Sequence, residues 1–216
     1  MMSGLGHIVR EKTILGALTL DALAVLFGGA TALLPIFADE ILKAGPIAFG
    51  ALRAATPVGA ILMTIVLTMR PRISPAGPLL FASVAAYGLC MIGFGFSTNL
   101  ALSLLLLVAS GAADNVSVVV RHVLVQTRTP NHIRGRVSAV NGVFIECSNE
   151  LGAFESGLVA RLFTPVISVV SGGIGTLIVV AITARSFPAL RRLREIREIT
   201  PPLESETTPI AGTTAR

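Results

Sequence analysis

Residues 13–37 read TILGALTLDALAVLFGGATALLPIF, and the only ionisable side chain among them belongs to Asp21. A helix needs about 20 mainly apolar residues to cross the hydrocarbon core of a bilayer, which is about 30 Å thick. This stretch is long enough and apolar enough to do so. We therefore expect residues 13–37 to form a transmembrane helix that carries one buried acid.

Further stretches along the chain pass the same test of length and apolar character. They cover residues 46–69, 77–96, 100–123, 137–163 and 165–184. The fifth stretch of the whole set, 137–163, is the most polar, and a longer polar link, QTRTPNHIRGR at 126–136, precedes it. Short links make consecutive spans antiparallel neighbours. The predicted fold class is therefore an all-α polytopic membrane protein with six transmembrane helices.

The composition agrees with this fold class and excludes others. Hydrophobic residues make up 53% of the chain and charged residues 13%, whereas soluble domains carry roughly 25% charged residues. The mean hydropathy is +0.80. The net charge of +5 does not indicate a nucleic-acid partner, because the basic residues form short clusters between apolar stretches, as is typical of membrane topology.

No catalytic or metal-binding pattern stands out in the sequence. Cys90 and Cys147 lie far apart inside apolar stretches, and neither a GxSxG nor an HExxH pattern occurs. We therefore expect no enzyme activity, no metal and no cofactor.

The charge distribution predicts the domain organisation and the orientation in the membrane. Most Lys and Arg residues fall on the side that holds both termini: Arg10, Lys12, Arg70, Arg72, Arg121, Arg128, Arg134, Arg136, Arg185, Arg191, Arg192, Arg194 and Arg197. Only Lys43 and Arg161 flank the spans on the opposite side. Since cytoplasmic loops are rich in Lys and Arg, both termini should be cytoplasmic. The predicted parts are a cytoplasmic segment 1–12, a helical bundle 13–184, a basic cytoplasmic stretch 185–199 and a disordered tail 200–216.

Ionisable residues at membrane depth are the candidate functional residues, since each costs at least about 2.5–3.5 kcal/mol at a helix centre. The substrate or proton pathway is predicted to contain Asp21, Arg53, Asp114, Glu146, Asn149, Glu150 and Glu155. By depth along their helices, Asp21, Asp114 and Glu146 fall in one layer of the inner half. An alternative is that these acids only stabilise helix packing.

Depth also suggests ion pairs. Arg53 lies at the depth of Glu155, with Glu150 nearer the middle, so we expect Arg53 to pair with one of them, either in a pathway or as a purely structural contact. Glu146 and Glu150 are four residues apart and share a helix face, which Asn149 extends. Arg121 ends the fourth stretch and is interpreted mainly as an interfacial anchor.

Several segments together resemble a known transporter family. They are LDALAVLFGGATALLPIFADEIL, GALRAATPVGA, FPALRRL and the long stretch GAADNVSVVVRHVLVQTRTPNHIRGRVSAVNGVFIECSNELGAFESGLVA. They are similar to the C-terminal half of a major facilitator superfamily transporter, in the bacterial branch that includes enterobactin exporters and is named for transmembrane secretion effectors. The resemblance covers residues 10–196, and its most specific parts are VQTRTP…RGRVSAVN and SNELGAFESG.

The resemblance implies that these spans correspond to helices seven to twelve of a twelve-helix protein in a bacterial inner membrane. The first six helices have no counterpart here, and RPR at 70–72 is a weak echo of the family's cytoplasmic signature. The implied partners are the lipid bilayer, a small-molecule substrate, and either an N-terminal six-helix half or a second copy. Arg134 and Arg136, with Arg121, would form a cytoplasmic gate between the halves.

The implied function is secondary active transport, specifically proton-coupled export of a small organic molecule. The alternative is a non-transporting membrane subunit or a truncated inactive remnant.

Overall fold

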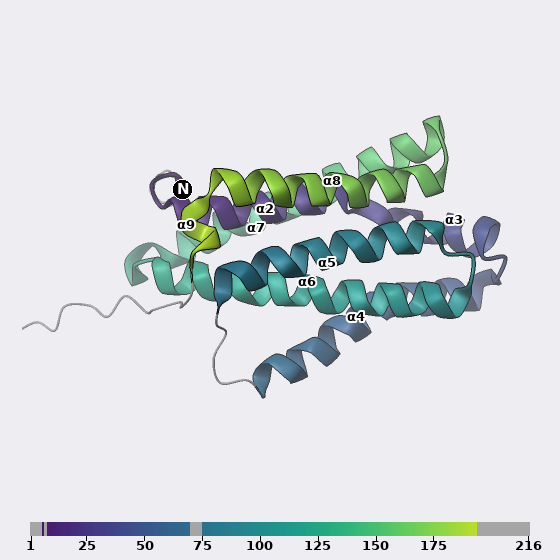
Figure 1. Cartoon of the computed structure of the whole chain (residues 1–216), viewed down its shortest axis with the longest axis horizontal. Helices are drawn as coiled ribbons and strands as arrows, with labels where there is room; N and C mark the ends of the chain where they lie inside the picture. Colours follow the sequence, from purple (N-terminus) through teal and green to yellow (C-terminus); the bar gives the residue numbers. More distant parts are fainter. Residues whose placement is uncertain (1–5, 7, 70–74, 194–216) are drawn as a thin grey trace, which may run out of the picture.

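The computed structural model describes residue 6 and residues 8–69 and 75–193, and the regular structure within these ranges is helical (Figure 1). The first membrane segment is broken into four pieces: α2 (Lys12–Phe27), the 3₁₀ helix η1 (Gly29–Leu33), α3 (Leu34–Ile36) and the π-helix η2 (Phe37–Ile41). The long helices that follow are α4 (Gly45–Thr68), α5 (Ala76–Phe96), α6 (Leu100–Arg128), α7 (Asn131–Leu162) and α8 (Pro165–Ser186). A short helix, α9 (Pro188–Arg191), follows α8.

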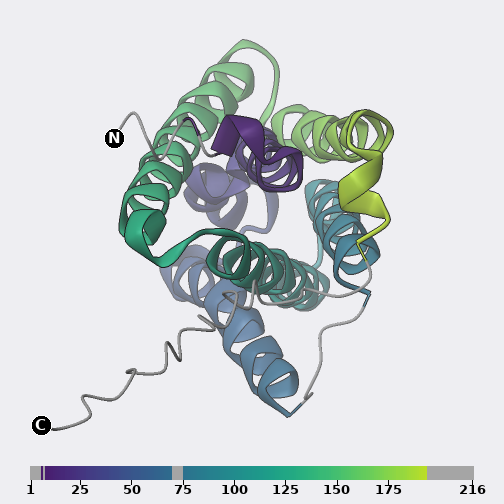
Figure 2. The same ribbon diagram turned by 90° about the vertical axis from the view of Figure 1, so that its left-hand side faces the viewer.

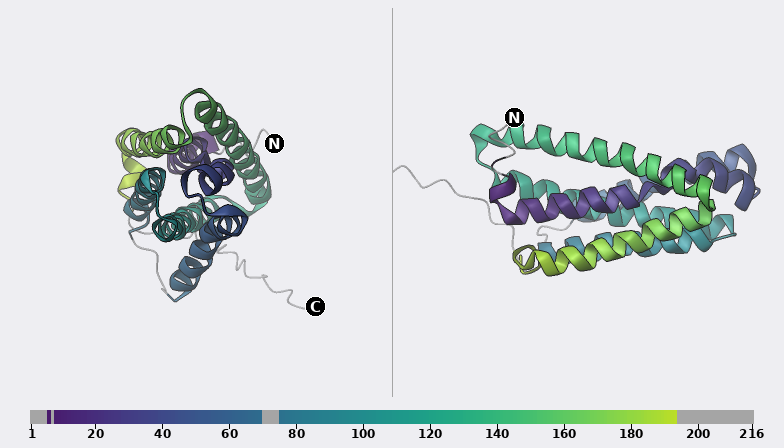
Figure 3. Two further views of the ribbon diagram at one scale, coloured as in Figure 1. Left: turned by 90° about the vertical axis from the view of Figure 1, so that its right-hand side faces the viewer. Right: turned by 90° about the horizontal axis from the view of Figure 1, so that it is seen from above.

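Five of these segments are long and apolar enough to cross a membrane: Lys12–Ile41, Gly45–Thr68, Ala76–Phe96, Leu100–Arg128 and Pro165–Ser186. The remaining long helix, α7, has 32 residues and runs along the same bundle (Figure 3), but its acids and asparagines make it too polar for that criterion. The chain is thus an all-α polytopic membrane protein, and the predicted span at 137–163 corresponds to its most polar helix.

The helices run roughly along one common axis, and the start of α2 and the short α9 lie at the same end of the bundle (Figure 1). Helix α6 packs against α4 and α5, α5 packs against α8, and α2 packs against α7 and α8. Seen along the bundle axis, α2 lies between α7 and α8 (Figure 2). Helix α4 contains Pro57 and splays away from its neighbours toward its C-terminal end (Figure 1), as expected for a helix that loses a backbone hydrogen bond at proline.

Glycines allow the closest of these contacts, as small residues do in membrane helices. A Cβ atom on Gly59 of α4 would collide with the carbonyl oxygen of Val108 on α6, and one on Gly111 of α6 would collide with that of Thr56 on α4. Gly172 of α8 meets the backbone of Phe27 in the same way. Backbones therefore touch directly where α4 meets α6 and where α8 meets the end of α2.

Three apolar clusters are buried in the described part of the bundle. Two lie toward the end at which α2 starts; one of them includes Leu20 and Leu124, and the other includes Ile14. The third, toward the opposite end, includes Phe37 and Phe94, whose rings stack with centroids 4.7 Å apart. The buried ionisable residues Asp21 and Arg121 therefore lie among apolar neighbours.

The prediction that residues 126–136 form a polar loop is wrong. Helix α6 continues to Arg128 and α7 begins at Asn131, so only Thr129 and Pro130 connect them. The apolar pattern ends where the lipid would end, but the helical hydrogen bonds continue beyond it. Pro130 stands directly before α7 with extended backbone angles, and a proline at that point does not interrupt a helical hydrogen bond.

The predicted terminal segments are only partly described. Residues 194–199 of the basic stretch and the whole predicted tail 200–216 lie outside the described residues, as do residues 1–5 and 7. The part of the basic stretch that is described folds back onto the bundle. Leu190 of α9 is buried, and the backbone N–H of Gly77 at the start of α5 donates to the carbonyl oxygen of Leu193.

Candidate functional site: a polar cavity inside the bundle

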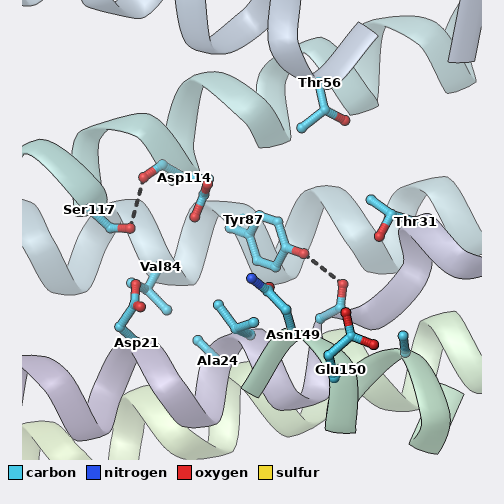
Figure 4. Close-up of a pocket in the computed structure, with 13 residues that line it drawn as sticks. Asp21, Ala24, Thr31, Thr56, Val84, Tyr87, Asp114, Ser117, Asn149 and Glu150 are labelled. Atoms are coloured by element: carbon cyan, nitrogen blue, oxygen red, sulfur yellow. Dashed lines mark hydrogen bonds between the residues drawn. The ribbon is translucent and has the colours of Figure 1, made fainter. Parts of the chain in front are cut away.

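A cavity of about 350 Å³ lies inside the bundle. Its polar lining comes from several helices (Figure 4). The lining residues are Asp21, Ala24, Val25, Gly28, Thr31, Thr56, Val84, Tyr87, Asp114, Ser117, Asn149, Glu150 and Ala153. The cavity therefore collects side chains from α2, η1, α4, α5, α6 and α7 at one place.

A buried ion pair lies beside this cavity. The guanidinium of Arg121 on α6 donates to the carboxylate of Asp21 on α2, and their side chains are 6% and 7% exposed. The interpretation of Arg121 as an interfacial anchor is therefore wrong. An Arg seven residues beyond Asp114 lies on nearly the same helix face, so it points into the bundle rather than toward the membrane surface.

Asp114 extends this charged layer along α6. Its carboxyl group points toward Asp21 across the cavity (Figure 4), and its charge interacts with those of both Asp21 and Arg121. The Ser117 hydroxyl donates to the Asp114 backbone carbonyl at 2.8 Å. Within the part of the chain that the structure describes, no hydrogen bond or ion pair engages the Asp114 carboxylate itself. Arg121 therefore pairs with Asp21, and Asp114 lies within range of its charge without forming an ion pair with it.

Tyr87 links the cavity to the break in the first membrane segment. Its hydroxyl donates to the carbonyl oxygen of Gly28 at 2.8 Å, and Gly28 directly follows the last residue of α2. A Cβ on Gly28 would collide with the Tyr87 hydroxyl, so only glycine fits here. The broken segment places Gly28 and Thr31 on the cavity wall.

Helix α7 contributes Asn149 and Glu150 to the cavity lining. Both residues are exposed. Gly152, on another face of α7, packs against the backbone of Leu26 at the end of α2. That contact holds α7 against α2, so its polar face is directed toward the acids of α2 and α6.

The structure brings some of the predicted pathway residues together and separates others. Asp21, Asp114, Asn149 and Glu150 line one cavity, whereas Arg53, Glu146 and Glu155 are not among its described lining residues. Glu146 shares a helix face with Glu150 but is exposed, and Glu155 accepts a hydrogen bond from Ser156 at 3.5 Å.

The predicted pairing of Arg53 with Glu150 or Glu155 is wrong within this chain. Arg53 is exposed on α4, and among the described residues it forms no ion pair with either acid. The prediction used depth alone, but α4 packs chiefly against α6.

The predicted gate residues lie in different surroundings. Arg134 and Arg136 are exposed in the first turns of α7, at the end of the bundle near the start of α2. Arg121 is buried in its ion pair. The structure thus separates Arg121 from the other two.

Sequence reasoning missed four polar members of the cavity: Tyr87, Thr31, Thr56 and Ser117. Tyr87 is the only tyrosine of the chain, and a tyrosine at the middle of an apolar span needs a partner for its hydroxyl. That signal was available. The threonine and serine residues gave none, because hydroxyl side chains occur throughout these helices and satisfy themselves on local backbone carbonyls.

Comparisons with known proteins agree with this architecture. The family model described as transmembrane secretion effector matches residues 9–205. The enterobactin exporters EntS of Escherichia coli O81 (strain ED1a), of Shigella boydii serotype 18 and of Escherichia fergusonii are each 26% identical to the chain over 203 residues. Each match covers 94% of this chain and 47% of the relative, so the chain spans about half the length of these relatives.

The matched region includes every long helix and the whole lining of the cavity. The relatives carry the name of exporters. The chain belongs to the transmembrane secretion effector family of the major facilitator superfamily.

Proposed function

We propose that this chain forms one half of a secondary active transporter that exports a small organic molecule in exchange for protons. The observation that carries the proposal is the polar cavity, in which Asp21, Asp114 and Glu150 gather inside an apolar bundle. Ionisable groups at membrane depth are expensive, and they typically mark substrate or ion pathways. A cavity of about 350 Å³ falls within the usual range for small-molecule sites, about 300–1,000 Å³.

The acids supply the proposed coupling to protons. In the deprotonated state, Asp114 and Asp21 compete for Arg121, since both interact with its charge. Protonation of either acid leaves Arg121 to the other. Proton binding at either acid therefore changes the charge of the cavity wall.

The proposed transporter requires a second six-helix half. Such transporters bind substrate between two halves and rock one half against the other. Arg53 on α4 and Glu146 on α7 are exposed at membrane depth, where lipid is an unfavourable neighbour. This supports a protein partner on that side, either an N-terminal six-helix half or a second copy, and Arg134 and Arg136 would contact it at the cytoplasmic gate.

The proposed orientation places both termini of the chain in the cytoplasm of a bacterial cell. Reporter fusions test it: a green fluorescent protein joined after Arg216 should fluoresce, and alkaline phosphatase at the same position should be inactive. An active phosphatase fusion contradicts the orientation.

A flux assay tests the transport function. The chain is reconstituted in proteoliposomes alone and together with the N-terminal half of a related exporter, and substrate movement is measured under an imposed pH gradient. Flux driven by the gradient is expected, and Asp114→Asn should abolish its dependence on the gradient. Glu40→Gln, an exposed acid outside the cavity, should retain full flux. If the correctly folded chain moves no substrate, either alone or together with the N-terminal half, the result favours the alternative, a non-transporting membrane subunit.

A further inference from the structure

We infer that the cavity selects organic cations over anions of the same size. The inference rests on the proposed transport function, because it assigns a substrate class to the same cavity. It is carried by the charge of the lining, by the hydrogen bonds already made there, and by the helix end that faces the cavity.

The charge balance of the cavity is negative. Asp21, Asp114 and Glu150 contribute three carboxylates, and Arg121 contributes one guanidinium through its pair with Asp21. Among the described lining residues there is no Lys, Arg or His. A cation entering the cavity therefore meets unneutralised carboxylates, whereas an anion meets only like charges.

The charged donor beside the cavity is already engaged, because the Arg121 guanidinium donates to Asp21. The described lining donors that make no hydrogen bond are neutral: the hydroxyls of Thr31 and Thr56 and the amide of Asn149. An anion would have to compete with Asp21 for Arg121 to gain a charged donor. A cation leaves that pair intact and pairs with the Asp114 carboxylate.

The break in the first membrane segment adds negative potential from the backbone. Helix α2 ends at Phe27, and Ala24, Val25 and Gly28 of its last turn line the cavity. Carbonyl oxygens at the C-terminal end of a helix carry partial negative charge, which is smaller here than at a free helix end because η1 begins at Gly29. This contribution comes from the backbone, so it is independent of the side-chain carboxylates and favours the same sign of ligand.

The other lining residues favour an organic cation over a metal ion. The described residues contain no group of three His, Cys, Asp or Glu side chains placed to hold a metal. Val25, Val84, Ala24 and Ala153 instead supply apolar surface, and Tyr87 supplies an aromatic ring that attracts cations. A hydrophobic body with one positive centre satisfies both parts of the lining.

Two probes of nearly the same shape and opposite charge test the inference. Tetraphenylphosphonium and tetraphenylborate are titrated against the purified full chain in detergent, and the saturable part of binding is measured by equilibrium dialysis. The phosphonium should bind at least about tenfold more tightly, a difference of about 1.4 kcal/mol. Equal or tighter binding of the borate overturns the inference.

Variants place the binding in the cavity. Asp114→Asn and Glu150→Gln should each weaken phosphonium binding about five- to tenfold, and Glu150 is exposed, so its variant should fold normally. Glu40→Gln, at an exposed site outside the cavity, should leave the affinity unchanged. Phosphonium affinity unchanged in both cavity variants overturns the inference.

The same measurements separate this inference from the proposed function. If phosphonium binding depends on Asp114 but the protein shows no flux, the inference is supported and only the proposed transport function is contradicted. Flux of an anionic probe, in a protein that does not bind phosphonium, supports transport and overturns the inference.

Discussion

The buried pair between Asp21 and Arg121 should couple the stability of α2 to that of α6. Asp21→Asn and Arg121→Gln each remove one charge and leave the other buried, since the two side chains are 7% and 6% exposed. Removing one partner of a buried pair costs about 3–5 kcal/mol. Removing both leaves neutral amides that hydrogen-bond to each other, so the double variant should lose much less than the sum of the single variants.

A double-mutant cycle measures this coupling. The chain has no tryptophan, so unfolding by sodium dodecyl sulfate in mixed micelles is followed by circular dichroism of the helices. We expect a coupling energy of about 2–3 kcal/mol, near the upper end for residues in contact. The free energy of unfolding should fall by at least about 3 kcal/mol in each single variant.

A second pair in the same protein provides the control. The Glu11 carboxylate oxygen lies 3.6 Å from a guanidinium nitrogen of Arg128, and the two side chains are 35% and 30% exposed. Exposed pairs contribute about 0–1 kcal/mol, so Glu11→Gln should change stability little. The reasoning is refuted if the Asp21 and Arg121 variants are additive to within about 0.5 kcal/mol, or if neither costs more than Glu11→Gln.

Further predictions concern packing. Gly59→Ala should destabilise the protein by about 1–3 kcal/mol, because the new Cβ meets the Val108 backbone. Gly50→Ala, which places its Cβ in open space on the same helix, should not destabilise it. Equal melting temperatures for these two variants contradict the close packing of α4 on α6. Tyr87→Phe should lower the free energy of unfolding by about 0.5–1.5 kcal/mol through loss of its bond to Gly28, and an unchanged unfolding midpoint would speak against that bond. Gly77→Ala should undock α9, because the new Cβ meets the Leu190 carbonyl, and trypsin should then cleave after Arg191 several-fold faster; an unaltered cleavage rate refutes the docking.

Most of the fold could be predicted from the sequence, because a bilayer imposes a single length on each apolar helix. The predicted span 165–184 matches Pro165–Ser186, and 77–96 matches Ala76–Phe96. The ends of α6 and α7 could not be predicted, because apolar character reports contact with lipid, whereas helical hydrogen bonds extend into the polar region. The break after Phe27 was hidden for a related reason: its residues remain apolar.

The candidate site was predicted less completely. Depth in the membrane is a single coordinate that can be counted along the sequence, and it selected Asp21 and Asp114, which do line one cavity. Pairing also needs the rotation of each helix and the identity of its neighbours. For this reason Arg121 was not recognised as the partner of Asp21, and Arg53 was assigned to the wrong acids.

The interrupted first segment packs against different helices on the two sides of its break. Its inner part, α2, packs against α7 and α8, whereas its outer part, α3 and η2, packs against α4. Gly28 and Thr31, at the break, also line the cavity. The residues at which the segment changes its neighbours are therefore the ones that a molecule in the cavity would touch.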